Sequence, residues 1–179
     1  LFKKRFDYLR WGPYLFTGTA PYVITQREIE NNESIRAHPH PNICAYHGVE
    51  VTKGFVTALI FTKYNCDLST YVARGAHFDP VNLLSQLKAA ITHIHALGFV
   101  HVDVKAENVF VDTSVQPARF VLGDFDSMHK EGEALQYKWG TPAWRDEELT
   151  EREVAVKEMD WYGLRMVEKW LRGKGWGRP

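Results

Sequence analysis

The sequence has little of several features that mark whole classes of protein. It holds 179 residues but only two cysteines, Cys44 and Cys66, which excludes a disulfide framework for a domain of this size. No apolar run approaches the roughly 18 residues that a membrane-spanning helix needs. Residues 1–6 are basic but lack the apolar stretch that follows in a secretory signal peptide. We therefore expect an intracellular protein, cytoplasmic or nuclear, with no membrane partner.

An excess of charge of either sign is also missing. Lys and Arg total 22, Asp and Glu total 22, and the formal net charge is zero. A protein that binds nucleic acid through its phosphates needs a basic surface, so we expect no nucleic-acid partner. With 45% hydrophobic and 25% charged residues, the composition is that of one globular domain with a sizeable core.

The most informative stretch is His-Val-Asp-Val-Lys-Ala-Glu-Asn at residues 101–108. It is followed by Gly-Asp-Phe-Asp at residues 123–126, with Asp124 sixteen residues after Asn108. Three further motifs frame the pair: His-Pro-His-Pro-Asn-Ile at 38–43, Gly-Thr-Pro-Ala-Trp at 140–144 with Glu148 four residues later, and Asp-Trp-Tyr-Gly-Leu at 160–164.

In this order and at these spacings, the motifs resemble those of eukaryotic-type protein kinases over roughly residues 1–170. The catalytic loop of that family reads H-R-D-L-x-x-x-N and is followed by D-F-G. In detail, Asp-Phe-Asp-Ser and the motif at 38–43 are similar to divergent kinase-like proteins of filamentous fungi. The resemblance implies transfer of a phosphoryl group from ATP, with Mg²⁺, to a serine or threonine of a protein substrate.

The resemblance also assigns roles to four residues of the two main motifs. Asp103 is the expected catalytic base that faces the incoming hydroxyl. Lys105 lies two residues on, hence on the same side of an extended loop, and is expected to reach the transferred phosphate. Asn108 and Asp124 supply a neutral and an anionic oxygen, the hard ligands that Mg²⁺ prefers.

A kinase also needs a strand lysine that holds the phosphates and a helix glutamate that pairs with it. Residues 1–6 are expected to form the strand, and we favour Lys3 as this lysine. The helix is expected over residues 25–37 with Thr25 as its N-cap, and Glu28 is the favoured glutamate. The competing candidates are Lys4 on the strand and Glu30 and Glu33 on the helix.

Two β-rich runs, residues 44–51 and 54–61, predict a hairpin. By resemblance, its second strand leads into the hinge of the kinase. Phe61 would then lie at the back of the nucleotide pocket, and the backbone from Thr62 to Tyr64 would bind the adenine edge.

Helical signals follow the hinge. Asp67 is placed to cap a short helix over residues 67–73, and apolar residues at three- and four-residue steps predict a long helix over residues 81–97 that Gly98 ends. Short strands are expected at residues 109–111 and 120–122.

Three departures from the family pattern limit what the resemblance implies. No Gly-rich loop precedes the strand lysine. Val102 replaces an arginine that contacts a phosphorylated activation loop, which predicts activation without phosphorylation of that loop. Asp126 replaces the glycine of D-F-G, where it tolerates unusual backbone angles and adds a potential metal ligand.

The order of elements, strands first and helices afterwards, predicts an α+β fold of two lobes. We expect residues 1–64 to form a small β-rich lobe, incomplete at its start, with the hinge. Residues 65–179 would form a mainly helical lobe that stops after the helix at 160–164. Three functions remain open at this point. The first is an active Ser/Thr protein kinase, favoured by the intact catalytic residues, and the second is a pseudokinase that acts as a nucleotide-binding or scaffolding module. The third is a small-molecule kinase of the aminoglycoside or choline type, against which Lys105 and the Gly-Thr-Pro motif argue.

Overall fold

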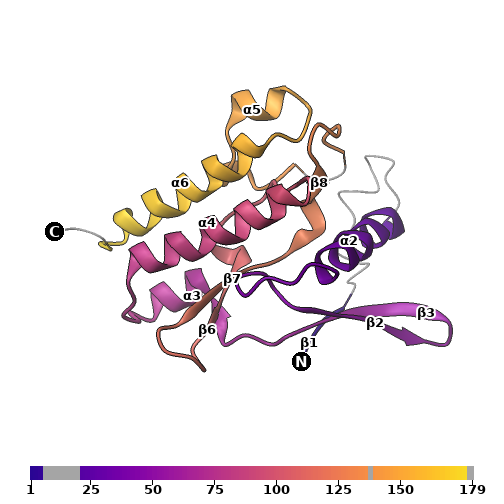
Figure 1. Cartoon of the computed structure of the whole chain (residues 1–179), viewed down its shortest axis with the longest axis horizontal. Helices are drawn as coiled ribbons and strands as arrows, with labels where there is room; N and C mark the ends of the chain where they lie inside the picture. Colours follow the sequence, from indigo (N-terminus) through magenta and orange to yellow (C-terminus); the bar gives the residue numbers. More distant parts are fainter. Residues whose placement is uncertain (6–20, 137–138, 177–179) are drawn as a thin grey trace.

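The computed structural model describes residues 1–5, 21–136 and 139–176. Figure 1 shows a sheet with one covering helix on one side of the molecule and a group of helices on the other. The helices are α2 (Pro21–Arg36), α3 (Leu68–Ala73), α4 (Pro80–Ala96), α5 (Glu147–Glu151) and α6 (Lys157–Gly173). The strands are β1 (Phe2–Arg5), β2 (Tyr46–Thr52), β3 (Phe55–Phe61), β4 (Cys66–Asp67), β5 (Phe99–Val100), β6 (Val109–Asp112), β7 (Arg119–Leu122) and β8 (His129–Lys130). The single-turn 3₁₀ helices are η2 (Ala106–Asn108), η3 (Phe125–Ser127) and η4 (Pro142–Trp144). The α+β, two-lobed architecture predicted from the sequence is confirmed.

The smaller lobe is an antiparallel sheet of order β1-β3-β2 that packs against helix α2. Its β2–β3 hairpin turns at Lys53 and Gly54, both with positive φ (52° and 82°), which is the backbone that tight hairpin turns require. The central strand β3 is buried at Ala58, Leu59 and Phe61. The predicted hairpin is therefore present, with bounds that differ by one or two residues.

Helix α2 begins earlier than the sequence suggests. It starts at Pro21, so Thr25 lies inside the helix, and its prediction as N-cap is wrong. Proline is well placed in the first turn because its missing N–H has no partner there. The helix buries Ile24 and Ile35 together with the polar Glu28 and two asparagines, a mixed face that masks the helical periodicity.

Helix α4 forms the centre of the larger lobe. Asp79 caps it by accepting a hydrogen bond from the amide of Val81 at 2.8 Å, and Pro80 occupies its first turn. Its residues Leu83, Leu87, Ala90, Ile91 and Ile94 are fully buried. It packs on β7 and α6, and its end leads through β5 into residues 101–108. The predicted helix is confirmed to within one residue at each end.

Helix α3 has the predicted cap, because the Asp67 carboxylate accepts from the amide of Thr70 at 2.8 Å. A sheet of order β4-β6-β7 links this region to the segment before Asp124. Both cysteines are free, as the sequence predicts. In the described part of the chain, no helix is long and apolar enough to cross a membrane.

Helix α6 approaches the 101–108 loop so closely that one position has no room for a side chain. A Cβ on Gly163 would lie 2.7 Å from the carbonyl oxygen and 2.8 Å from the Cβ of Val104. Gly163→Ala should therefore lower the free energy of unfolding by about 1–3 kcal/mol, because backbone must move. The matched control is Gly173→Ala on the same helix, where a Cβ meets nothing within 4 Å. Urea denaturation measures both, and equal effects would contradict this packing.

Candidate active site

The 101–108 loop is fixed by one buried carboxylate from helix α6. Asp160 is fully buried, and its two oxygens accept the backbone amides of His101 and Val102, each at 2.8 Å. Its Oδ2 also lies 2.8 Å from Nε2 of His95 on α4. The sequence motif at 160–164 thus braces the loop.

Val102 takes a backbone conformation that is rare for its residue type. Its φ is 71°, in the left-handed region that a β-branched side chain disfavours. The two hydrogen bonds to Asp160 hold the loop in this shape. The side chain packs in a small apolar cluster with Val100, Leu135 and Ala155.

Asp103 is held by three donors. Its Oδ1 accepts the backbone amide of Thr141 at 2.8 Å, and its Oδ2 accepts Nζ of Lys105 at 2.6 Å and Nδ2 of Asn108 at 3.1 Å. Burial alone would raise the pKa of this carboxyl, but the hydrogen bond and positive charge of Lys105 outweigh it and bring the pKa below its usual value. The carboxylate is therefore ionised at neutral pH.

Lys105 also donates to the hydroxyl of Thr141 at 2.6 Å. The loop and the Gly-Thr-Pro motif are therefore in direct contact. Gly140 permits this approach, since a Cβ there would lie 2.6 Å from the carbonyl oxygen of Val102. The structure brings together Asp103, Lys105 and Asn108, as predicted, and adds Thr141 to the group.

The second motif is tied to the first by His101. Its Nε2 lies 3.0 Å from the carbonyl oxygen of Gly123, and its ring packs edge-on against Phe125. Asp124 follows with a φ of 62°, in the left-handed region that aspartate tolerates better than most residues. The unusual backbone angle therefore falls on Asp124, whereas Asp126 lies in the η3 turn.

The strand lysine is Lys4, and the prediction of Lys3 for this place is wrong. Nζ of Lys4 lies 2.7 Å from Oε1 of Glu28 and 2.6 Å from Oδ1 of Asp124. Its distance to Oδ2 of Asp126 is 3.8 Å. Lys3 instead pairs with Glu50 at 2.9 Å on an exposed surface.

The reason for the correction is the alternation of side chains along β1. Lys4 lies opposite Leu59 in β3, and Phe2, itself half exposed, lies opposite Phe61, so these residues share the face of the sheet on which Leu59 and Phe61 are buried. Lys3 points to the other face. The sequence contains this signal, because Lys4 has phenylalanines two residues before and two residues after it, whereas Lys3 has Leu1 and Arg5.

The electrostatics of the Lys4 cluster differ from those of Asp103. Burial lowers the pKa of Lys4, but the carboxylates of Glu28, Asp124 and Asp126 outweigh it, so the pKa is raised and the amine is protonated. Burial raises the pKa of Glu28 to about 7, and the Lys4 charge opposes this shift. Glu28, and not Glu30 or Glu33, is the helix glutamate that reaches the lysine.

Lys4, Glu28 and Asp124 line a cavity of about 420 Å³, a volume typical of small-molecule sites. The polar residue Asn108 lines it together with these three residues. Phe61, Thr62, Tyr64 and Phe110 line it as well, and the rings of Tyr64 and Phe110 stack at a centroid distance of 5.9 Å.

One part of the hinge prediction needs correction. The amide of Thr62 donates to the carbonyl of Ala45 at 2.9 Å, so this N–H is used inside the protein. The Tyr64 hydroxyl accepts from the amide of Ala45 at 3.3 Å. Both residues line the cavity, but Thr62 does not offer its amide to a ligand.

The donor set fits Mg²⁺ in type. Asn108 and Asp124 face the same cavity and supply one amide and one carboxylate oxygen. Among the described residues, no group of three or more His, Cys, Asp or Glu side chains gathers as a metal site. An ion held by these two residues would need further oxygens from its ligand, which is how Mg²⁺ binds with nucleotide phosphates.

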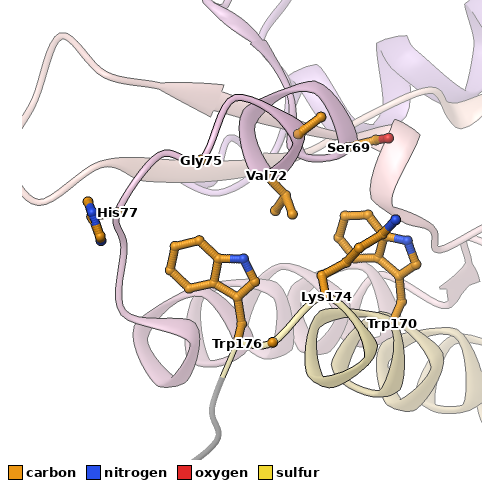
Figure 2. A pocket seen from close by; sticks show the side chains of 9 residues that line it. Ser69, Val72, Gly75, His77, Trp170, Lys174 and Trp176 are labelled. Carbon is orange, nitrogen blue, oxygen red and sulfur yellow. The ribbon is translucent and has the colours of Figure 1, made fainter.

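A second cavity, of about 510 Å³, lies between α3 and the end of α6 and shares no lining residue with the first. Figure 2 shows Val72 of α3 pointing towards the space between Trp170 and Trp176. Trp176 also stacks on Phe78 at a centroid distance of 4.3 Å.

A family model described as protein kinase domain matches residues 20–169. The chain is 37% identical over 95 residues to serine/threonine-protein kinase US3 of human herpesvirus 2 (strain HG52). The matched region covers 51% of this chain and 19% of that protein. It is 28% identical over 144 residues to calcium/calmodulin-dependent protein kinase type 1B of Rattus norvegicus. That matched region covers 78% of this chain and 42% of the rat protein. The chain thus spans less than half the length of these relatives.

Solved structures agree on the fold. A chain of the yeast RNA Pol II CTD kinase CTDK-1 complex matches with a TM-score of 0.71 and 23% identity, over 85% of this chain and 50% of that chain. The Cydia pomonella granulovirus kinase PK-1 matches with a TM-score of 0.62 and 21% identity, over 82% and 54% respectively. At this level of identity, they establish the fold alone.

The role of Asp160 gives a stability prediction. In Asp160→Asn, an NH₂ group replaces one acceptor oxygen, so a buried donor of the loop loses its partner. We expect the free energy of unfolding to fall by about 2–3 kcal/mol. The control is Asp79→Asn, because asparagine caps a helix about as well as aspartate. Urea denaturation compares the two, and a loss below 0.5 kcal/mol for Asp160→Asn, about the size of an ordinary surface substitution, would contradict the bracing role.

Proposed function

The chain belongs to the protein kinase family, and from this membership we propose that it transfers the γ-phosphoryl group of ATP to a serine or threonine hydroxyl of a protein substrate. The observation that carries the proposal is the arrangement of Asp103. Its ionised carboxylate is held by Lys105, Asn108 and Thr141, and Asn108 also lines the cavity. The proposed base, a cation and the side chain proposed to bind the metal are thus side by side.

In the proposed reaction, the substrate hydroxyl oxygen forms a bond to the γ-phosphorus, and the bond to the β,γ-bridging oxygen breaks. The hydroxyl proton passes to Asp103, whose lowered pKa keeps the carboxylate ionised before the reaction. Lys105 lies next to the carboxylate and offsets negative charge on the transferred group. Most of the catalytic effect would come from positioning, because the chain supplies no covalent step.

Lys4 is proposed to bind the phosphates of ATP, and Glu28 holds its ammonium group in place. Asn108 and Asp124 would hold Mg²⁺, which supplies charge neutralisation on the phosphate oxygens when it is bound. The adenine is proposed to lie between Phe61 and the stacked pair of Tyr64 and Phe110. Backbone beyond Thr62 would contact its edge.

The Ser/Thr type is supported by the names of the relatives and by the contact of Lys105 with Thr141. The acceptor would therefore lie beside the Gly-Thr-Pro motif. The alternative proposed from the sequence, a nucleotide-binding scaffold, predicts binding without transfer, so the two functions separate in a single assay.

We expect Asp103→Asn to lower kcat for transfer by at least about 10²-fold, because the proton acceptor is lost. Its affinity for ATP with Mg²⁺ should stay within about twofold, since the amide keeps an oxygen for the Thr141 contact. Transfer of ³²P from ATP to a mixture of serine- and threonine-containing peptides measures kcat, and calorimetry measures affinity. Asp79→Asn, remote from the site, is the control and should match the unchanged chain. Binding of ATP by the unchanged chain without any transfer would refute the enzyme and favour the scaffold.

The correction of the strand lysine gives a second test. Lys4→Met should weaken ATP binding roughly tenfold to a hundredfold, because a charge-assisted hydrogen bond of about 1.5–3 kcal/mol is lost. Lys3→Met removes an exposed ion pair and should change affinity by no more than about twofold. Calorimetry with ATP and Mg²⁺ compares the variants at a temperature where both are folded by circular dichroism. If Lys3→Met weakened ATP binding more than Lys4→Met, Lys3 would be the phosphate-binding lysine after all.

A further inference from the structure

Helix α2 is attached to the segment that follows Asp124 by side chains one turn apart. Nδ2 of Asn31 donates to the carbonyl oxygens of Phe125 and Met128, at 3.1 and 2.9 Å. Nε and Nη2 of Arg27 also donate to the Met128 carbonyl, at 3.3 and 3.2 Å. The side of the helix that carries Glu28 is therefore oriented by contacts to this segment.

The same arginine makes the ion pair that closes the contact. Nη1 and Nη2 of Arg27 donate to Oε1 and Oε2 of Glu133, both at 2.8 Å. The side chains are 18% and 33% exposed, which is well below the exposure of a solvated surface pair. Parallel two-point bonding of this kind is stronger and more directional than a single contact. The hydrogen bond from Arg27 lowers the pKa of Glu133, which keeps the pair charged at neutral pH.

Glu133 is itself fixed to the larger lobe. Its Oε2 accepts the amide of Lys130 at 2.9 Å, and its carbonyl accepts the amide of Ala155 at 2.8 Å. Two residues on, the amide of Leu135 donates to the carbonyl of Glu153 at 2.8 Å. The Leu135 side chain packs against Val102 of the 101–108 loop. The carboxylate is thus a rigid anchor, continuous with the loop that carries Asp103.

We propose that Arg27 and Glu133 are a positioning pair, in which a permanent carboxylate on the 125–136 segment holds helix α2 so that Glu28 meets Lys4, without any phosphate on that segment. The pair joins the two lobes, because Arg27 and Glu28 are neighbours on α2 and Glu133 belongs to the larger lobe. Val102 fits this arrangement, since it provides apolar contact to Leu135 where an arginine would need an anionic partner. The proposal rests on the proposed function for its catalytic consequence, but its structural part stands independently.

The test is a double-mutant cycle with Arg27→Gln, Glu133→Gln and the double variant. Each single change should raise the KM for ATP or lower kcat so that kcat/KM for ATP falls roughly tenfold, since one charge of a bidentate pair is lost. The KM for the peptide substrate should stay within about twofold, which a general loss of folding would not produce. The double variant should lose no more than either single variant, because the two residues act as one unit.

The control is Glu131→Gln, which removes another ion pair of the same segment, to Lys157 at 2.7 Å, and should change kcat/KM by less than about twofold. Treatment of the unchanged chain with a protein phosphatase should leave its activity the same. Losses that multiply in the double variant, an equal loss in Glu131→Gln, or a large loss on phosphatase treatment would each overturn the proposal.

A second readout needs no activity and separates this proposal from the proposed function. Hydrogen–deuterium exchange of peptides covering residues 21–36 should become roughly tenfold faster in either single variant than in the unchanged chain. In the double variant, exchange should be no faster than in the single variants. Exchange in α4 should not change. If the unchanged chain transfers no phosphate but the exchange results hold, the positioning pair stands and the enzyme assignment fails. Unchanged exchange in both single variants would refute the pair itself.

Discussion

The site depends on the position of one ammonium group. Nζ of Lys4 lies within 2.7 Å of a carboxylate oxygen on helix α2 and within 2.6 Å of one on Asp124. Strand β1, helix α2 and the segment after β7 therefore meet at a single charge. Desolvation of these groups is costly, and only their mutual attraction offsets it. The pKa of Glu28 is raised to about 7, because burial of this carboxyl outweighs the attraction of Lys4. Since the ion pair with Lys4 does not fully offset that burial, other contacts are needed to orient α2, and those of Arg27 and Asn31 supply them.

The two halves of the site are stabilised by different physical means. Asp103 stands on a loop whose backbone amides are bound by the buried Asp160 and whose neighbour Val102 is held in a strained conformation. That half is built into the core of the larger lobe, and it cannot shift without breaking buried hydrogen bonds. The half with Lys4 is held by ion pairs, and the one from Lys4 to Asp124 joins the two lobes. We expect changes in these ion pairs to move Lys4 and Glu28 more than Asp103.

The sequence predicts most of the fold because its strongest signals are local. Apolar spacing and the stop at Gly98 place helix α4 to within one residue, and two β-rich runs place the β2–β3 hairpin. Motif spacing likewise predicts a site from Asp103, Lys105, Asn108 and Asp124. The structure joins the first three by hydrogen bonds and places Asn108 and Asp124 in the lining of one cavity. Helix α2 was less well placed, because its buried face is partly polar: Glu28 and two asparagines are inside, so hydrophobic periodicity is weak. Its buried polar side chains have their partners in other elements, which local sequence patterns do not show.

The choice between Lys3 and Lys4 shows what kind of information was missing. Both residues are lysines of the predicted strand and no motif separates them, but only Lys4 lies on the face of β1 that carries Phe2, and the pleat of the strand decides between them. The partnership of Arg27 with Glu133 is harder to foresee, since the residues are 106 positions apart and neither belongs to a motif. It depends on the backbone bonds that place Glu133 against Ala155. Long-range charge pairs of this type follow from the folded backbone, so they are seen only when the arrangement of the lobes is known.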